Sequence, residues 1–102
     1  MDNKIYTINY YPSAYKDLEE IKRYWEDILE TSADDFMVEI YQITKRLEDS
    51  PLSHHQPANE YLRAKGYRIL PIKNYYVFYM VKETEVQLHR VLYSKMDFTK
   101  LF

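Results

Sequence analysis

The second half of the chain interleaves basic side chains with tyrosines, and these residue types could carry chemistry. The basic positions are Arg68, Lys73, Lys82, Arg90 and Lys95, and the tyrosines are Tyr67, Tyr75, Tyr76, Tyr79 and Tyr93. Cations can neutralise phosphate, and tyrosine rings can stack on bases or hydrogen-bond to a nucleic-acid backbone. Tyrosine also supplies apolar bulk with a polar tip, which suits both a small core and a recognition surface.

Packing is the competing interpretation of the tyrosines. Alternate residues of a strand point to the same face of a sheet. In the segment 75–82, one face would carry Tyr76, Phe78 and Met80, and the other Tyr75, Val77, Tyr79 and Val81. Both faces are apolar enough to be core, so most of these tyrosines are expected to pack inside the domain.

Three cations, Arg68, Arg90 and Lys95, fit a core poorly because burying an unpaired charge is costly. Either they contact an anionic ligand, or they form structural salt bridges, for instance to Glu60 or Asp97.

Composition excludes several other kinds of site. The chain has no cysteine, which removes disulfides, thiolate zinc sites and cysteine nucleophiles. Its single glycine, Gly66, leaves no Gly-rich phosphate loop. His54 and His55 are adjacent and lack metal-ligand spacing, so we expect no metal site and no cofactor. The acidic pairs at 19–20, 26–27 and 34–35 lie on predicted helices and are interpreted as solvated faces.

Length and charge indicate the number of domains and the kind of partner. The 102 residues fit a single domain, 1–102. No apolar run approaches the roughly 20 residues that span a bilayer, and the first residues lack the apolar core of a signal peptide, so we expect a cytoplasmic protein. Residues 1–50 carry twelve acidic and six basic side chains, whereas 51–102 carry four and eight. This asymmetry indicates an acidic, solvated half and a basic half that faces an anion, although small domains also vary this much by chance.

The first half of the sequence predicts a strand followed by two helices. Residues 4–11 alternate like a strand. Ser13 is the expected N-cap of a helix that runs to about Thr31, and Ser32 with Asp35 has capping-box spacing for a second helix that closes at Ser50. Because the connection between them is short, the helices should form an antiparallel hairpin.

The second half predicts a loop and three strands. Residues 51–65 are polar and are interpreted mostly as loop, and strands follow at 67–73, 75–82 and 86–94, joined by tight turns. The order β-α-α-β-β-β predicts an α+β domain in which the helical hairpin covers one face of a small, mainly antiparallel twisted sheet. The other face is expected to be open, and function is expected there.

An ordered set of short motifs runs through this half. Tyr-Arg occurs at 67–68, then a turn, Tyr-x-x-x-Tyr at 75–79, Arg-Val-Leu at 90–92, and Lys95 and Asp97 beyond them. In this order and spacing, the stretch resembles the RelE/ParE toxins of type II toxin–antitoxin systems. The family's element order also matches the predicted one, so the resemblance covers essentially the whole chain.

The resemblance implies a toxin that inhibits growth and is neutralised by a cognate antitoxin. RelE-like members cut mRNA in the ribosome, whereas ParE-like members inhibit DNA gyrase and are not nucleases. RelE-like members typically place an arginine directly after the first Tyr of the central strand, and arginine or histidine near the end of the last strand. This chain has Tyr76 at the first position, and Ser94 and Lys95 at the second, which favours the ParE branch.

The ParE interpretation assigns target binding, without catalysis, to Arg68, Lys73, Tyr76, Arg90, Tyr93 and Lys95. The RelE-like alternative would make Arg68, Arg90 and Lys95 catalytic, with Tyr93 and His89 as further candidates, although His89 is better explained as a strand residue. A third alternative is an inactive protein that persists as an antitoxin-binding module. The implied partners are a cognate antitoxin and either DNA gyrase or the ribosome with its mRNA, with no membrane contact.

Overall fold

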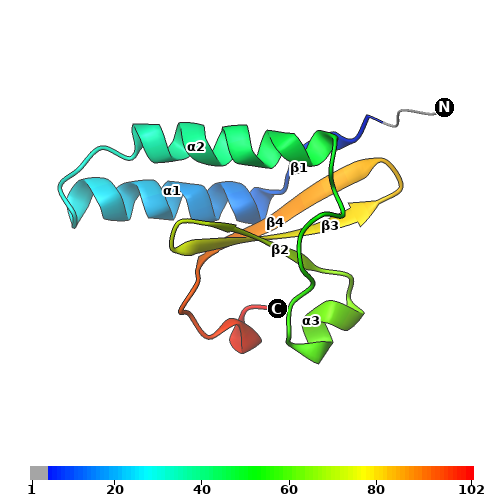
Figure 1. Ribbon diagram of the computed structural model, residues 1–102. Helices are drawn as coiled ribbons and strands as arrows, with labels where there is room; N and C mark the ends of the chain where they lie inside the picture. Colours follow the sequence, from blue (N-terminus) through cyan, green and yellow to red (C-terminus); the bar gives the residue numbers. More distant parts are fainter. Residues whose placement is uncertain (1–4) are drawn as a thin grey trace.

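The computed structural model describes residues 5–102 and contains a four-stranded sheet with two long helices on one face (Figure 1). In chain order the elements are β1 (Thr7–Tyr10), α1 (Pro12–Asp27), α2 (Asp34–Lys45), a 3₁₀ turn (Arg46–Glu48), α3 (Glu60–Ala64), β2 (Arg68–Ile72), β3 (Tyr75–Lys82), β4 (Glu85–Tyr93) and a second 3₁₀ turn (Phe98–Lys100). The predicted α+β class is confirmed, and α3 is the helix that the polar composition of residues 51–65 concealed.

The sheet has the order β1-β4-β3-β2. β2, β3 and β4 form the predicted antiparallel meander, and β1 lies parallel to β4 because the helical hairpin carries the chain back across the sheet. Pro71 is tolerated because β2 is an edge strand. A register shift sets Tyr79 opposite Leu88 and Phe78 opposite Arg90, which leaves His89 as the extra residue of a β-bulge.

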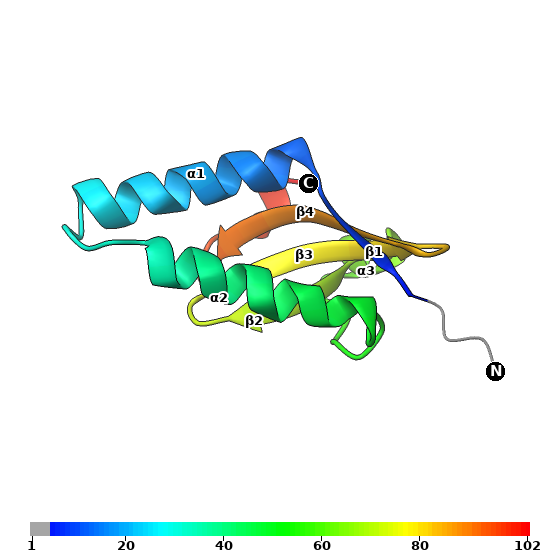
Figure 2. The same ribbon diagram turned by 90° about the horizontal axis from the view of Figure 1, so that it is seen from above.

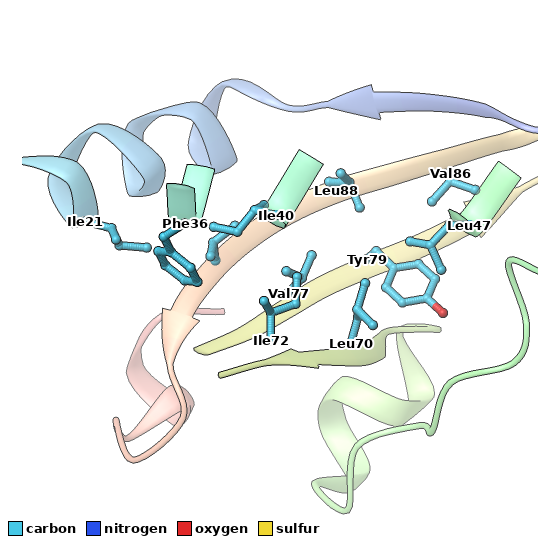
Figure 3. Close-up of a cluster of buried hydrophobic side chains, with 11 residues drawn as sticks. Ile21, Phe36, Ile40, Leu47, Leu70, Ile72, Val77, Tyr79, Val86 and Leu88 are labelled. Carbon is cyan, nitrogen blue, oxygen red and sulfur yellow. The ribbon is translucent and has the colours of Figure 1, made fainter. Parts of the chain in front are cut away.

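Helices α1 and α2 run antiparallel to each other over the same face of the sheet, as the short connection predicted (Figure 2). Their apolar sides and the sheet enclose the main core (Figure 3). The helices contribute Ile21, Phe36 and Ile40, the following 3₁₀ turn contributes Leu47, and the strands contribute Leu70, Ile72, Val77, Tyr79, Val86, Leu88 and Val91.

The second face of the sheet is not open, so this expectation was wrong. Leu62 of α3 packs there against Tyr67, Phe78 and Leu92. Phe98 and Phe102 join the same cluster, and Figure 1 shows α3 and the C-terminal segment on the side of the sheet opposite the long helices. Apolar side chains alternate onto both faces of β3, so each face needs a cover, and short segments provide the second one.

The helix boundaries differ from the predictions because local hydrogen bonds were misassigned. Ser13 is not an N-cap: α1 begins at Pro12, and the Ser13 hydroxyl instead donates to the carbonyl of His89 at 2.6 Å. The Ser32 hydroxyl accepts from the N–H of Asp34, so the capping box with Asp35 does not form.

The strand predicted at 4–11 is the shorter β1, and its first residue, Lys4, lies outside the described residues. The last two strands agree closely with the prediction, since β3 has the predicted bounds and β4 is displaced by one residue. Within residues 5–102, no helix combines the length and hydropathy that crossing a membrane requires.

Candidate functional site

Arg90 on β4 is clasped by Asp17 of α1. Its Nε donates to Oδ2 of Asp17 at 2.7 Å and its Nη2 donates to Oδ1 at 2.9 Å, while the backbone N–H of Val91 donates to Oδ2 at 2.9 Å. The Asp17 side chain is only 6% exposed. The hydrogen bond to Asp17 raises the pKa of Arg90 above its ordinary value, so the guanidinium remains charged.

This clasp explains why α1 lies against the end of β4. β1 pairs with β4 only as far as Tyr10 opposite Leu88, so the edge of β4 lacks a strand neighbour beyond that point. There the Asp17 carboxylate accepts the hydrogen bond from the N–H of Val91 that a neighbouring strand would otherwise accept. Arg90 therefore has the structural salt bridge considered from the sequence, but its partner is neither Glu60 nor Asp97. One feature of the sequence could have identified Asp17 as a residue that faces the sheet: it lies four residues before Ile21 and so on the same side of α1.

Arg68 holds a different part of the molecule. Its Nη1 donates to the carbonyl of His54 at 2.9 Å and to the carbonyl of Leu52 at 3.3 Å. The buried Tyr79 hydroxyl donates to the carbonyl of Pro51 at 2.8 Å, and burial raises the pKa of Tyr79 to about 12. Together these side chains tie the segment 51–54 to the sheet.

Arg68 and Arg90 extend from opposite faces of the sheet. Arg68 alternates with Leu70 and therefore shares the face that the long helices cover. Arg90 alternates with Leu92, which belongs to the second-face cluster. The two arginines named from the sequence consequently do not converge on one ligand.

His89 lies in a hydrogen-bonded chain on the second face. Its Nδ1 lies 2.9 Å from the Tyr67 hydroxyl and its Nε2 lies 3.1 Å from Oε1 of Gln87, whose amide nitrogen donates to Glu85. Because an amide oxygen only accepts, Nε2 of His89 carries the proton and Nδ1 of the neutral ring accepts from Tyr67. Burial lowers the pKa of His89, with Lys82 adding to the effect.

The remaining candidates lie in three regions. Lys73, in the turn between β2 and β3, is paired with Glu39 of α2 at 3.5 Å, and Tyr76 packs on Phe98 in the second-face cluster. Tyr93, at the end of β4, is 42% exposed, and Lys95 is exposed in the turn that follows.

A hollow of about 660 Å³ lies between α1, the end of β4 and the C-terminal segment. We call it the β4 hollow. Its lining includes Ile21, Tyr24, Tyr75, Val91, Tyr93 and Leu101. The Asp17–Arg90 clasp and Glu20 also border it. Of the six residues named from the sequence, Arg90 and Tyr93 therefore meet here, with Lys95 two residues beyond.

A second concavity of about 650 Å³, the β1 groove, lies where β1 meets the two long helices. Its lining includes Ile5, Tyr10, Tyr15, Leu18, Met37 and Tyr41. This groove was missed from the sequence. The available signal was Tyr15, three residues before Leu18 and thus on the same side of α1.

No group of three or more histidine and acidic side chains that could hold a metal ion occurs within the described range 5–102.

Comparison with known proteins connects this geometry to a family. Residues 8–98 match the ParE toxin of type II toxin-antitoxin system, parDE. A solved structure described as the chromosomal ParDE TA system from P. aeruginosa is similar to this chain with a TM-score of 0.74 and 17% identity, over 90% of this chain and 99% of that chain. The search of curated proteins finds no match. The structural likeness shows the shared fold, and because the family match spans most of the sequence, the chain belongs to the ParE toxin family of type II toxin–antitoxin systems.

Proposed function

We propose that this toxin inhibits DNA gyrase by binding it and does not cut mRNA. The observation that carries the proposal is the separation of Arg68 and Arg90 onto opposite faces of the sheet, each with an internal partner. Cleavage of RNA by its own 2′-hydroxyl needs cations that converge on one phosphate, together with a base and an acid. The arrangement supports binding over phosphate chemistry.

The state of His89 adds to this support. Both ring nitrogens are engaged, one by Tyr67 and the other by Gln87, and burial lowers the pKa of the ring. A general base needs a nitrogen within reach of the substrate proton. In this chain the imidazole instead links β4 to Tyr67, the residue that precedes β2.

The residues that we propose for the gyrase contact are Arg90, Tyr93 and Lys95, because they lie at or beside the β4 hollow. Arg90 retains guanidinium N–H groups beyond the two nitrogens that Asp17 binds. The sequence analysis also assigned Arg68, Lys73 and Tyr76 to target binding. Because each has an internal partner, we propose instead that these three residues stabilise the surrounding fold.

The toxin's partner in such a module is a cognate antitoxin, and we propose that the antitoxin occupies the β1 groove. The groove is apolar and partly rimmed by Tyr15 and Tyr41, each more than half exposed. Exposed aromatic rings beside an apolar groove are typical of a site for an apolar peptide segment that orders on binding.

Induced expression, with and without the neighbouring reading frame, tests the proposal. Expression alone should stop growth and leave reporter plasmids less negatively supercoiled, while mRNA remains intact. Co-expression of the antitoxin should restore both growth and supercoiling. Rapid cleavage of ribosome-bound mRNA with normal supercoiling would overturn the proposal in favour of a RelE-like nuclease, and normal growth would favour an inactive antitoxin-binding module.

A further inference from the structure

One apolar stripe on α1 continues past the edge of the sheet. Ile21, Tyr24 and Ile28 are three and four residues apart, so they lie on one side of the helix and its cap. Their exposed fractions rise from 8% to 49% and 65% along this stripe. Figure 2 shows the hairpin extending beyond the strands at this end, and none of the described elements covers Tyr24 and Ile28 there.

The stripe runs out of the β4 hollow, so the two form one surface. Ile21 and Tyr24 line the hollow from α1, and Tyr93, Met96 and Leu101 line it from the other side. Tyr93 and Met96 are each more than 40% exposed, and Leu101 is 37% exposed. Exposed apolar residues that meet in a single hollow are the usual mark of a protein-binding site, whereas scattered ones are not.

The charge on the α1 side of this surface is negative, whereas Lys95 lies beyond its opposite side. Glu20 borders the hollow, and Asp17 there is neutralised by Arg90. The last turn of α1 contains Glu26 and Asp27 and no basic residue. Acidic groups at a helix C-terminus oppose the helix dipole, so this placement does not serve the stability of α1.

We infer that the β4 hollow and the stripe of Tyr24 and Ile28 bind an apolar segment of the target protein that also carries lysine or arginine. The inference rests on the proposed function and specifies the partner surface. Apolar side chains would fill the hollow, and a cation would lie between Glu20 and the ring of Tyr24 or Tyr93. A nucleic acid is disfavoured because its phosphates would meet Glu20 and the acidic end of α1.

The target segment and the antitoxin then occupy different sides of α1. Tyr15 and Leu18 border the β1 groove, whereas Glu20 and Tyr24 border the β4 hollow. At 100° per residue these two pairs lie on opposite sides of the helix. A substitution at Glu20 or Tyr24 should therefore affect the target and leave antitoxin binding unchanged.

The experiment compares Glu20→Lys with Glu19→Lys, two identical charge changes at neighbouring exposed positions, of which only Glu20 borders the hollow. With purified gyrase and relaxed plasmid, Glu20→Lys should raise the half-inhibitory concentration roughly fivefold, as expected for reversing one rim charge. Glu19→Lys should stay within about twofold of wild type, and both variants should retain the wild-type melting temperature. Equal effects of the two substitutions, or none from Glu20→Lys, would overturn the inference.

An apolar comparison and a cellular one complete the design. Tyr24→Ala should weaken inhibition about tenfold, whereas Tyr61→Ala, which removes an exposed tyrosine from α3, should not. Growth arrest on expression of each variant is measured in parallel, because this readout does not depend on which protein is the target. If wild type spares gyrase yet arrests growth and Glu20→Lys abolishes the arrest, only the gyrase proposal fails. If wild type inhibits gyrase and Glu20→Lys does so equally, only the inference fails, and a wild type without either effect would overturn both.

Discussion

Replacing Asp17 by alanine should destabilise the protein more than any change at an exposed acid of α1. The substitution removes the acceptor of three hydrogen bonds, two from the Arg90 guanidinium and one from the N–H of Val91. Removing one partner of a buried ion pair typically costs about 3–5 kcal/mol, because the other charge is left uncompensated. The Arg90 side chain is 23% exposed, so water compensates it in part and we expect a loss of about 2–3 kcal/mol.

Urea denaturation followed by circular dichroism measures this loss, and thermal unfolding should show a melting temperature lower by roughly 10–20 °C for a domain of this size. Asp17→Asn should be less damaging than Asp17→Ala, since the amide oxygen can still accept one of the N–H groups. Glu19→Ala, which removes an exposed acid from the same helix, should change stability by no more than about 0.5 kcal/mol.

A double-mutant cycle with Arg90→Met isolates the ion pair from other effects of truncation. The two sites should couple by about 1–3 kcal/mol, because each single change leaves the other side chain without its partner. A loss below about 1 kcal/mol for Asp17→Ala, or a coupling energy near zero, would refute the conclusion that this clasp fixes α1 to β4.

Three further predictions concern the scaffold. Tyr79→Phe should lower the free energy of unfolding by about 1–2 kcal/mol in urea, because the Pro51 carbonyl loses its donor; an unchanged midpoint would contradict this. The lowered pKa of His89 means that the folded state favours the neutral ring. The neutral ring therefore contributes to the free energy of unfolding in full above about pH 6.5, and this contribution is lost as the pH falls toward the pKa of the folded state. His89→Gln should reduce the loss of stability between pH 7 and 5, and an identical pH profile would argue against it. Glu30 has a φ of 52°, so Glu30→Gly should stabilise the hairpin by roughly 0.5–1 kcal/mol in the same denaturation assay, and a decrease would exclude strain there.

The sequence predicted the sheet well because the meander is encoded locally. Strands 75–82 and 86–94 are rich in β-branched and aromatic residues and are separated by short polar turns, and β3 and β4 follow them within a residue. The cover of the second face was not predictable in the same way. It depends on Leu62, Phe98 and Phe102, which come from short segments without any periodicity.

The candidate site was predicted only in part, for a similar reason. The pattern of the family identified Arg90, Tyr93 and Lys95, and the structure brings the first two to one hollow. Asp17 was not among the residues predicted for the site, because periodicity cannot distinguish an acid that faces water from one that accepts a hydrogen bond from a strand edge. Arg68 and Arg90 point to opposite faces because of the strand register and the bulge at His89. Neither feature can be deduced from the spacing of residues in the sequence.

Gyrase activity in the presence of the purified toxin tests the central claim most directly. Relaxed plasmid, ATP and gyrase are incubated with increasing toxin, and a translation extract receives the same toxin so that mRNA integrity is measured alongside. We expect supercoiling to fall with toxin concentration while the mRNA stays intact. Full supercoiling activity together with cleaved mRNA would contradict the account.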